Sequence, residues 1–582
     1  GLRRFLAPYR GALVAGVALV VVDAVLTLAG PALIRFGLDH GVVRGSQSLL
    51  WAVTAVFLAV TLVDWAVVWA QQRQTGRTAE RLLFALRIRI FAHLQRLGLD
   101  FYEREMAGRI MTRMTSDVEA LAQLFQQGLV TLVVAGLTAV GVAVALVVLD
   151  WRLAAAAMTV VPPLIALTWW FRRTSDAAYA RVRDKVAGVM ASLQEGLSGV
   201  RVTHAFARQD RNYSEFRQVA GEHLDARLEG NRLSATYFPA VELLGQVATV
   251  VVVGYGAGLV RAGTLTPADL IAFVLYLNLF FMPVTQLSHT FDVFQQAQAA
   301  ADKLTELLAT PVSPADGPGA APLPSLSGAL RLDGVRFRYP GEGAWALNGI
   351  DFALTPGETV ALVGRTGAGK STVVKLLARF YDPTEGRVTA DGVPLTDLPV
   401  AGYRRHLGLV PQEAHLFSGT IFDNIAYGRP EAGAAEVEAA ARAVGAHDFV
   451  AGLPDGYATP VSERGRSLSA GQRQLLALAR ARLVDPAVLL LDEATSNLDL
   501  ATEARVQAAM GALSRGRTTV IVAHRLATAA RADRIVVLDA GRIAEEGTHA
   551  ELLARGGLYA AMWRAGDPDA EPPGEEILEP TG

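Results

Sequence analysis

Long runs of apolar residues fill the first half of the chain. Each of six runs is close to the roughly 20 residues that a helix needs to cross about 30 Å of hydrocarbon. The runs cover residues 11–34, 49–70, 128–149, 153–171, 239–259 and 270–287. One such run is also compatible with a buried helix of a large soluble domain. Six in succession predict an α-helical membrane domain with about six transmembrane helices.

The connections between these runs differ strongly in arginine content. Residues 71–127 and 172–232 are rich in Arg, whereas the alternate connections at 35–48, 150–152 and 261–267 are short and carry few. Arginine-rich connections stay on the cytoplasmic side of a membrane. The bias therefore predicts that the N-terminus and the chain after the sixth run are both cytoplasmic.

The two arginine-rich connections are not loop-like. Residues 71–97 and 174–218 carry apolar side chains at helical spacing and few helix breakers, which predicts that the spans continue as helices well beyond the bilayer. Near their far ends lie Phe101-Tyr102-Glu103 and His204-Ala205-Phe206-Ala207. We expect these segments to form short helices that dock on the soluble half of the chain.

The composition changes after Leu308. Residues 310–327 are rich in Pro, Gly and Ala, which is typical of a linker. Residues 328–565 are expected to form a soluble domain, and the acidic, Pro-rich residues 566–582 a disordered tail. The membrane domain then covers residues 1–309.

Composition excludes some functions. The 582 residues include no cysteine, so disulfides and thiolate metal sites are ruled out. A formal net charge of −2 argues against nucleic acid as a partner held by overall charge. Basic residues are nearly all Arg. The lysines are Lys185, Lys303, Lys370 and Lys375.

A phosphate-binding loop follows the predicted buried strand at residues 360–363. It consists of Gly364, Arg365, Thr366, Gly367, Ala368, Gly369, Lys370 and Ser371, followed by Thr372. This fits G-x-x-x-x-G-K-[ST], in which glycines let backbone N–H groups surround a phosphate at a helix N-terminus. Lys370 is expected to contact the β- and γ-phosphates, and the Ser371 hydroxyl to ligate Mg²⁺.

Two further predicted strands end in polar residues. Residues 488–491 lead into Asp492-Glu493, and residues 520–523 lead into His524. Asp492 suits the Mg²⁺ shell, and Glu493 is placed to orient or polarise the attacking water. His524 is expected to contact the γ-phosphate, since ligands bind at the carboxyl edge of parallel sheets. Helix capping by the two carboxylates would not explain their strand-end placement beside a phosphate loop. A lone histidine is usually structural, and the place of His524 at this edge favours the phosphate contact instead.

A second candidate phosphate contact lies between the phosphate loop and Asp492. It is the segment Leu468-Ser469-Ala470-Gly471-Gln472. This segment resembles the signature of the ATP-binding cassette (ABC) proteins, with Ala470 in place of the usual glycine. The other motifs occur in the order typical of that family. The resemblance implies an α/β P-loop NTPase domain of ABC type.

The resemblance also assigns roles to single residues. Tyr339 matches the aromatic that stacks on adenine, and Gln412 the glutamine that senses Mg²⁺ and faces the membrane domain. Asp499 lies in the segment Ser496-Asn497-Leu498-Asp499, which is similar to the D-loop. Residues 462–465 resemble the X-loop of exporters, with Ser462 where glycine is more usual.

The membrane half resembles type IV ABC exporters, the fold of multidrug and lipid exporters. The resemblance implies a half-transporter that uses ATP and Mg²⁺ to export hydrophobic or amphipathic compounds across the cytoplasmic membrane. An importer with an exporter-like fold and a lipid flippase remain alternatives. In this family the signature contacts ATP bound by the other subunit. Ser469, Ala470, Gly471, Gln472 and Asp499 would therefore serve a partner half.

The partner is a second ABC half-transporter, as a heterodimer, a homodimer or half of a longer fused protein. In related heterodimers an altered signature impairs one of the two sites. Ala470, together with Leu475 where the homodimers commonly have Arg, favours a heterodimer, although Ala is nearly as small as Gly. This chain's own pocket keeps Lys370 and Glu493.

The transported compound is poorly specified by the sequence. Asp23, Asp64 and Glu242 lie within predicted spans, where charges are costly and usually face a cavity or a partner. Recognition of cationic or amphipathic substrates is one interpretation of these positions. An ion pair between helices or a position near the membrane interface is equally compatible with them.

Overall fold

The computed structural model describes residues 10–321, 325–462, 465, 467–492, 500–523 and 525–566. The chain divides into two compact units. The first combines residues up to His93 with Gly108–Ala309, and the second combines Leu94–Ala107 with the residues from Thr310 onward. The short segment Leu94–Ala107 thus leaves the helical first half of the chain and packs within the second unit.

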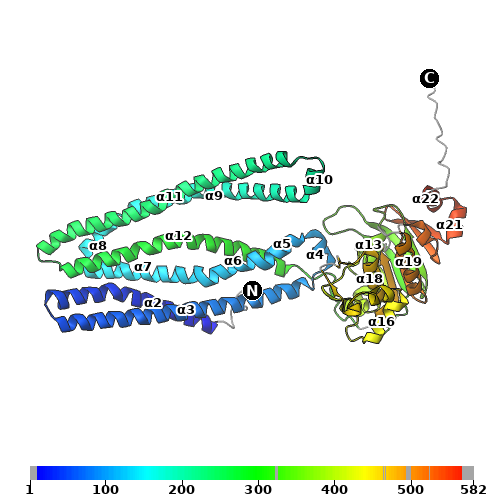
Figure 1. The fold of residues 1–582 in the computed structure, drawn as a ribbon, viewed down its shortest axis with the longest axis horizontal. Helices are drawn as coiled ribbons and strands as arrows, with labels where there is room; N and C mark the ends of the chain where they lie inside the picture. The colour runs from blue at the N-terminus through cyan, green and yellow to red at the C-terminus, as the bar shows by residue number, and fades with distance from the viewer. Residues whose placement is uncertain are drawn as a thin grey trace, which may run out of the picture. The chain divides into compact units, whose positions relative to one another are not determined.

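The first unit is built from long helices (Figure 1). Its principal helices are α2 (Arg10–Phe36), α3 (Gln47–Leu94), α7 (Leu129–Leu149), α8 (Trp151–Met158), α9 (Val161–Ser198), α10 (Val200–Ala205), α11 (Gln209–Arg261) and α12 (Pro267–Ala309). Between α4 (Leu99–Arg104) and α7 the chain continues through α5 (Ala107–Thr112), α6 (Val118–Gln123) and short π-helical stretches. Helix α9 packs along α11, and α7 packs along α12 and α2.

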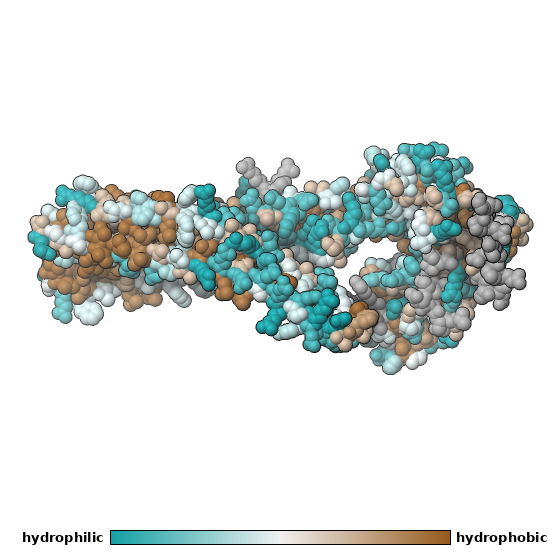
Figure 2. Space-filling view, turned by 90° about the horizontal axis from the view of Figure 1, so that it is seen from above, coloured by the Kyte–Doolittle hydropathy of each residue, from teal (hydrophilic) through white to brown (hydrophobic). Residues whose placement is uncertain are grey.

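Within the described residues, five stretches are long and apolar enough to cross a membrane. They are Arg10–Val43, Gln47–Leu94, Ala107–Leu149, Trp151–Ser198 and Gln209–Arg261. Pro267–Phe281 is a shorter apolar stretch and coincides with the start of the sixth predicted span. Figure 2 shows apolar side chains gathered over one part of this unit and polar ones over the rest. These observations confirm a helical domain with several membrane-spanning helices.

The helices are also much longer than a bilayer. Helix α3 has 48 residues, which is about 72 Å at 1.5 Å per residue against about 30 Å of hydrocarbon. Residues 71–97, expected to be helical, lie largely within α3, and residues 174–218 lie largely within α9, α10 and α11. The prediction that spans continue as helices beyond the bilayer is therefore confirmed.

The second unit contains a six-stranded sheet with the order β12-β11-β3-β10-β9-β6. The strands are β3 (Thr359–Val363), β6 (Leu407–Val410), β9 (Val488–Asp492), β10 (Thr518–Val522), β11 (Arg534–Asp539) and β12 (Arg542–Gly547). All neighbours are parallel except β11 and β12. The three strands predicted around the site are β3, β10 and β9, which are adjacent. Their side chains are almost entirely buried, as expected for parallel strands covered on both faces.

A second sheet and a helical layer complete the fold. The sheet has the order β2-β1-β4-β5, with β1 (Leu330–Phe337), β2 (Leu347–Leu354), β4 (Glu385–Ala390) and β5 (Val393–Pro394); β7 (Gly419–Thr420) pairs with β8 (Pro460–Val461). The helices are α4 (Leu99–Arg104), α13 (Lys370–Leu377), α14 (Val400–Arg404), α15 (Ile421–Ala426), α16 (Ala434–Ala443), α17 (His447–Ala451), α18 (Ala470–Val484), α19 (Leu500–Ser514), α20 (Leu526–Ala529), α21 (His549–Arg555) and α22 (Leu558–Gly566).

Two of the apolar cores that the structure describes in this unit lie beside the predicted site. One joins the second sheet, α13 and one face of the central strands. The other joins α15, α16, α18 and α19 to the opposite face of β9. The phosphate loop belongs to the first core and the L-S-x-G-Q segment to the second.

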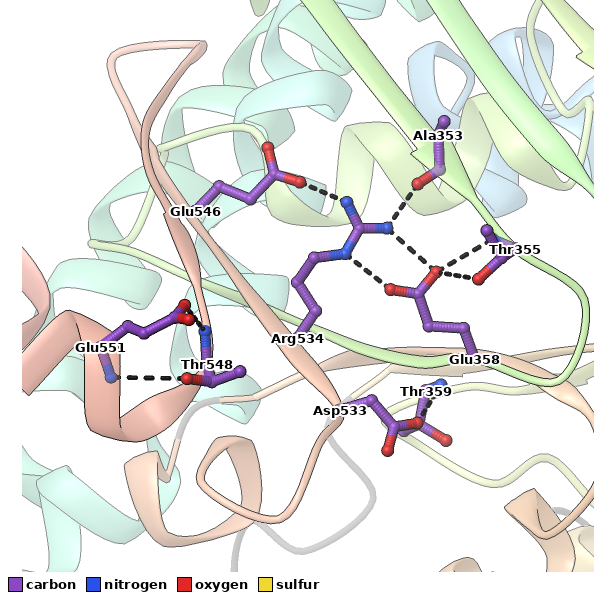
Figure 3. A network of polar contacts seen from close by, with 9 residues as sticks. All are labelled: Ala353, Thr355, Glu358, Thr359, Asp533, Arg534, Glu546, Thr548 and Glu551. Carbon is purple, nitrogen blue, oxygen red and sulfur yellow. Dashed lines mark hydrogen bonds and ion pairs between the residues drawn. The ribbon is translucent and has the colours of Figure 1, made fainter.

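Arg534 links the two sheets through a cluster of polar contacts (Figure 3). Its guanidinium donates to both carboxylate oxygens of Glu358, at 2.6 and 3.0 Å, and to Glu546 and the carbonyl oxygen of Ala353. These partners come from the turn before β3, from β12 and from β2. The side chains of Arg534 and Glu358 are only 24% and 15% exposed, so solvent screens the pair incompletely.

Replacing Arg534 with alanine should destabilise the second unit. Breaking these hydrogen bonds leaves Glu358 partly buried without its cation, a loss of about 1–3 kcal/mol. We expect a lower Tm of the full chain in nanodiscs, measured by differential scanning fluorimetry. Arg542→Ala is the matched control, because that exposed arginine of β12 has no ion pair among the described residues. Equal Tm values for R534A and R542A would contradict the assignment.

The same contact predicts a pH dependence. Burial alone would raise the pKa of Glu358, but hydrogen bonds from Arg534 and Thr355 outweigh burial and hold that pKa below its ordinary value of 4.5. A lowered folded-state pKa contributes stability that is present above the ordinary value and is lost as the pH falls through the folded value. The Tm difference between wild type and R534A should therefore stay constant from neutral pH to about 5.5 and shrink below 4.5. A difference that grows on acidification would argue against this cause.

Candidate nucleotide-binding site

The predicted phosphate loop connects β3 to α13. Strand β3 ends at Val363 and helix α13 begins at Lys370, so the loop lies at the carboxyl end of a buried parallel strand. Gly369 caps the helix with φ of +101°, and a Cβ added there would lie 2.6 Å from the side chain of Leu347. Glycine alone fits this backbone position without strain. The helix N-terminus therefore begins directly at the loop, an arrangement suited to binding phosphate.

Lys370 is held inside this loop. Its side chain is buried, and Nζ donates hydrogen bonds to the carbonyl oxygens of Gly364 (2.7 Å) and Arg365 (3.0 Å). The neighbouring residues divide into an exposed rim and a buried base. Exposed are Arg365, Thr366, Gly367 and Ser371, and buried are Ala368 and Thr372. The loop thus presents a fixed cation behind a solvent-accessible rim.

Tyr339, the candidate adenine contact, is joined directly to α13. Its hydroxyl lies 3.0 Å from Thr372 Oγ1, and Lys375 Nζ lies 5.1 Å from its ring centroid. Phe337 and Tyr381 contact the ring edge-to-face, with centroids at 5.0 and 5.5 Å. The ring is therefore oriented by neighbours on several sides and remains half-buried.

Asp492 lies on the same sheet edge as the phosphate loop. It ends β9 and stands opposite Val522 of β10, which in turn stands opposite Leu362 of β3. Gln412 follows β6, whose Val410 stands opposite Leu491, and its side chain is exposed. The predicted Mg²⁺ contacts Ser371, Gln412 and Asp492 therefore follow the carboxyl ends of three strands of one sheet.

Several predicted site residues lie outside the described residues. These are Glu493, Asp499 and His524, together with Glu463 and Arg464 of the X-loop segment. The residues that precede Glu493 and His524 are described: Asp492 ends β9, and Ala523 follows β10. The assignments of Glu493 and His524 stay predictions.

The L-S-x-G-Q segment forms the N-terminus of α18. Ser469 Oγ accepts a hydrogen bond from the backbone N–H of Gln472 (3.2 Å), and Gln472 Oε1 accepts one from the N–H of Ser469 (2.9 Å). This reciprocal pair is a capping box. Ser469 and Ala470 are exposed, whereas Gly471 is buried. A helix of 15 residues therefore presents its positive end at the surface, as anion binding requires.

Sequence reasoning missed three residues beside the site. Glu103 of α4 bonds to both Lys375 and Tyr381, although the sequence placed only a docking helix at this position. Lys375 was noticeable as one of few lysines in an arginine-rich chain. No local pattern indicated that Glu103 and Lys375 meet. The docking of the first predicted segment is confirmed within the second unit, whereas that of the second, in and after α10, stays a prediction.

Comparison with known families agrees with this geometry. Residues 13–284 match the ABC transporter transmembrane region, and residues 347–496 match the ABC transporter family of ATP-binding domains. The chain belongs to the ABC transporter family, with one transmembrane region fused ahead of one ATP-binding cassette.

Individual relatives make the placement more specific. The chain is 45% identical over 566 residues to a multidrug efflux ATP-binding/permease protein of Mycobacterium bovis, covering 97% of this chain but 47% of that protein. It therefore spans about half the length of that relative. It is 37% identical to the ATP-dependent lipid A-core flippase of Chromobacterium violaceum, covering 93% of this chain and 92% of the flippase.

A solved structure is similar along its whole length. This is a bacterial Atm1-family ABC exporter with ATP bound, with a TM-score of 0.80 and 30% identity, covering 97% of this chain and all of that one. The exporter-like fold expected from the sequence is confirmed.

Proposed function

We propose that the chain is one half of an ATP-driven exporter of hydrophobic or amphipathic compounds. The observation that carries this is a complete phosphate loop and Asp492 on one sheet edge, in the same chain as several helices long enough to span a membrane. Relatives named for multidrug efflux and lipid A-core flipping support such cargo. The whole-length similarity to an exporter supports export over import. Lipid flipping is the second candidate.

ATP hydrolysis is assigned to this chain's own pocket. Lys370 and the N-terminus of α13 bind the phosphates, Tyr339 stacks on the base, and Glu493 orients the attacking water. His524 contacts the γ-phosphate, and Gln412 senses the Mg²⁺ beside it. Closure of the site on ATP, followed by hydrolysis, shifts the membrane helices between inward- and outward-facing states.

Mg²⁺ fits the oxygen donors on this edge. Among the described residues no group of three or more His, Asp or Glu is placed to hold a metal. A cation at this edge would have few protein ligands, and phosphate oxygens would fill other coordination positions, as is usual for Mg²⁺. We assign the Ser371 hydroxyl, the Asp492 carboxylate and the Gln412 amide oxygen to it. When bound, Mg²⁺ neutralises charge that develops on the transferred phosphoryl group.

The partner is a second ABC half-transporter. The exposed N-terminus of α18 carries Ser469, Ala470, Gly471 and Gln472, and it belongs to a different core from the phosphate loop. We infer that this end, with Asp499, contacts ATP in the partner's pocket, so that neither site closes within one chain. Ala470 favours a heterodimer in which the partner's pocket is the weaker one.

The proposed location is the cytoplasmic membrane. The bilayer surrounds the apolar helices, and the arginine-rich extensions, the N-terminus and the ATPase lie in the cytoplasm. The cargo would enter from the cytoplasm or the inner leaflet.

Glu493→Gln should retain ATP binding but nearly abolish turnover. Loss of the carboxylate that positions water is expected to lower kcat by about 10²- to 10⁴-fold, measured as phosphate release by the chain with its partner in nanodiscs. Glu431→Gln, at an exposed glutamate of the same domain, is the control and should keep wild-type turnover. Undiminished ATPase in E493Q would overturn the catalytic assignment.

Purifying the chain alone tests the heterodimer. Without its partner we expect little stable dimer and weak ATPase, because the signature that would complete its pocket is missing. Size-exclusion chromatography with light scattering and a phosphate-release assay measure both. A stable dimer of the chain alone with robust ATPase would establish a homodimer instead.

A further inference from the structure

Helix α4 contacts the surroundings of Tyr339, the candidate adenine contact, through one carboxylate. Glu103 Oε1 accepts a hydrogen bond from Lys375 Nζ at 2.8 Å, and Glu103 Oε2 accepts one from the Tyr381 hydroxyl at 2.7 Å. Both donors belong to the second unit, on α13 and just after it. Both oxygens of the carboxylate are thus engaged by residues that surround Tyr339.

Lys375 carries this contact on to Tyr339. Its ammonium lies 5.1 Å from the Tyr339 ring centroid and 3.4 Å from the Tyr339 hydroxyl. That hydroxyl lies 3.0 Å from Thr372 Oγ1, in the first turn of α13. An ammonium over one face of an aromatic ring is attracted by the ring quadrupole. Tyr339 is therefore held at its hydroxyl end by Lys375 and Thr372, and its ring packs edge-to-face with two aromatic neighbours.

The protonation states of Lys375 and Tyr381 agree with these hydrogen bonds. Burial alone would lower the pKa of Lys375, but the Glu103 carboxylate and the Tyr339 hydroxyl outweigh burial and raise it above its ordinary value. Burial, and then the hydrogen bond to Glu103, raise the pKa of Tyr381. Lys375 therefore stays an ammonium and Tyr381 a neutral donor throughout the physiological range.

Docking of α4 does not depend on Glu103 alone. Leu99 packs against the core that contains the phosphate loop, and Phe101 is buried. Gly98 approaches the linker so closely that a Cβ there would lie 1.7 Å from the carbonyl oxygen of Ser313. Removing the Glu103 charge should therefore leave α4 in place and affect mainly Lys375 and Tyr339.

We propose that Glu103 is a positioning residue for nucleotide-base recognition, acting by holding Lys375 against Tyr339. The inference rests on the proposed function, because Tyr339 is taken to stack on adenine. Through this contact the segment that joins α3 to α5 senses whether a base occupies the pocket. Binding linkage is reciprocal, so the state of α4 also sets the affinity for ATP.

Glu103→Gln tests the proposal, because it keeps the shape and the Tyr381 acceptor but removes the charge that holds Lys375. We expect the KM and the equilibrium Kd for ATP to rise about tenfold with a much smaller change in kcat, the pattern of lost uniform binding. Inorganic tripolyphosphate, which has the phosphates but no base, should inhibit wild type and E103Q equally. Glu103→Asp should recover part of the affinity.

Asp100→Asn is the matched control. Asp100 is an acidic residue of the same helix, and its carboxylate accepts a hydrogen bond from Arg104, also on α4. D100N should bind ATP as wild type does. All measurements use the full chain with its partner in nanodiscs, and thermal unfolding shows that each variant is folded.

Two results would overturn the proposal. One is an unchanged Kd for ATP in folded E103Q. The other is a tripolyphosphate inhibition constant that rises in parallel with the Kd for ATP, because that would place the damage in the phosphate loop. Equilibrium binding also separates this inference from the proposed function. A chain that hydrolysed no ATP would refute the function, while the Kd comparison would still decide the role of Glu103.

Discussion

The binding of a polyphosphate anion at the carboxyl edge of a parallel sheet is the constraint on which the rest of the ATPase unit depends. Strands β3, β10 and β9 are buried on both faces and adjacent in the sheet. Their ends therefore bring together segments that are distant in the chain. This arrangement brings the phosphate loop and Asp492 to the same edge of the sheet. Within the loop, Lys370 donates hydrogen bonds to the carbonyl oxygens of Gly364 and Arg365. Apolar cores pack against both faces of these strands.

The same unit separates the phosphate loop from the segment that we propose contacts a partner's ATP. The phosphate loop starts α13 in one core, and the L-S-x-G-Q segment starts α18 in the other. Both use a helix N-terminus to meet negative charge. Ser469 has its hydroxyl engaged in a capping box and lies exposed, which suits contact with a second ATPase. Under the proposed function, the substitution at Ala470 would act on the partner's pocket, whereas Lys370 belongs to this chain's own phosphate loop.

Local patterns in the sequence were sufficient to predict the helices and strands around the site, but not all the contacts between them. Apolar runs predicted the spans, and G-x-x-x-x-G-K-[ST] predicted a strand, a loop and a helix, because both signals are contained in neighbouring residues. Glu103 and Lys375 are far apart in sequence, as are Arg534 and Glu358, and their pairing depends on the complete fold. The local sequence around such charged residues does not indicate which residue each one pairs with. Glu493 and His524, predicted from strand ends, lie outside the described residues and remain predictions.

ATP-driven export through this half and its partner is the central claim. Inside-out membrane vesicles that contain both halves test it most directly, because their cytoplasmic face is outside and accessible to ATP. The account predicts that ATP drives a lipophilic cation such as ethidium, or a fluorescent lipid, into the vesicles, and that no accumulation occurs in E493Q. ATP-dependent loss of preloaded probe from the same vesicles would contradict export and establish import.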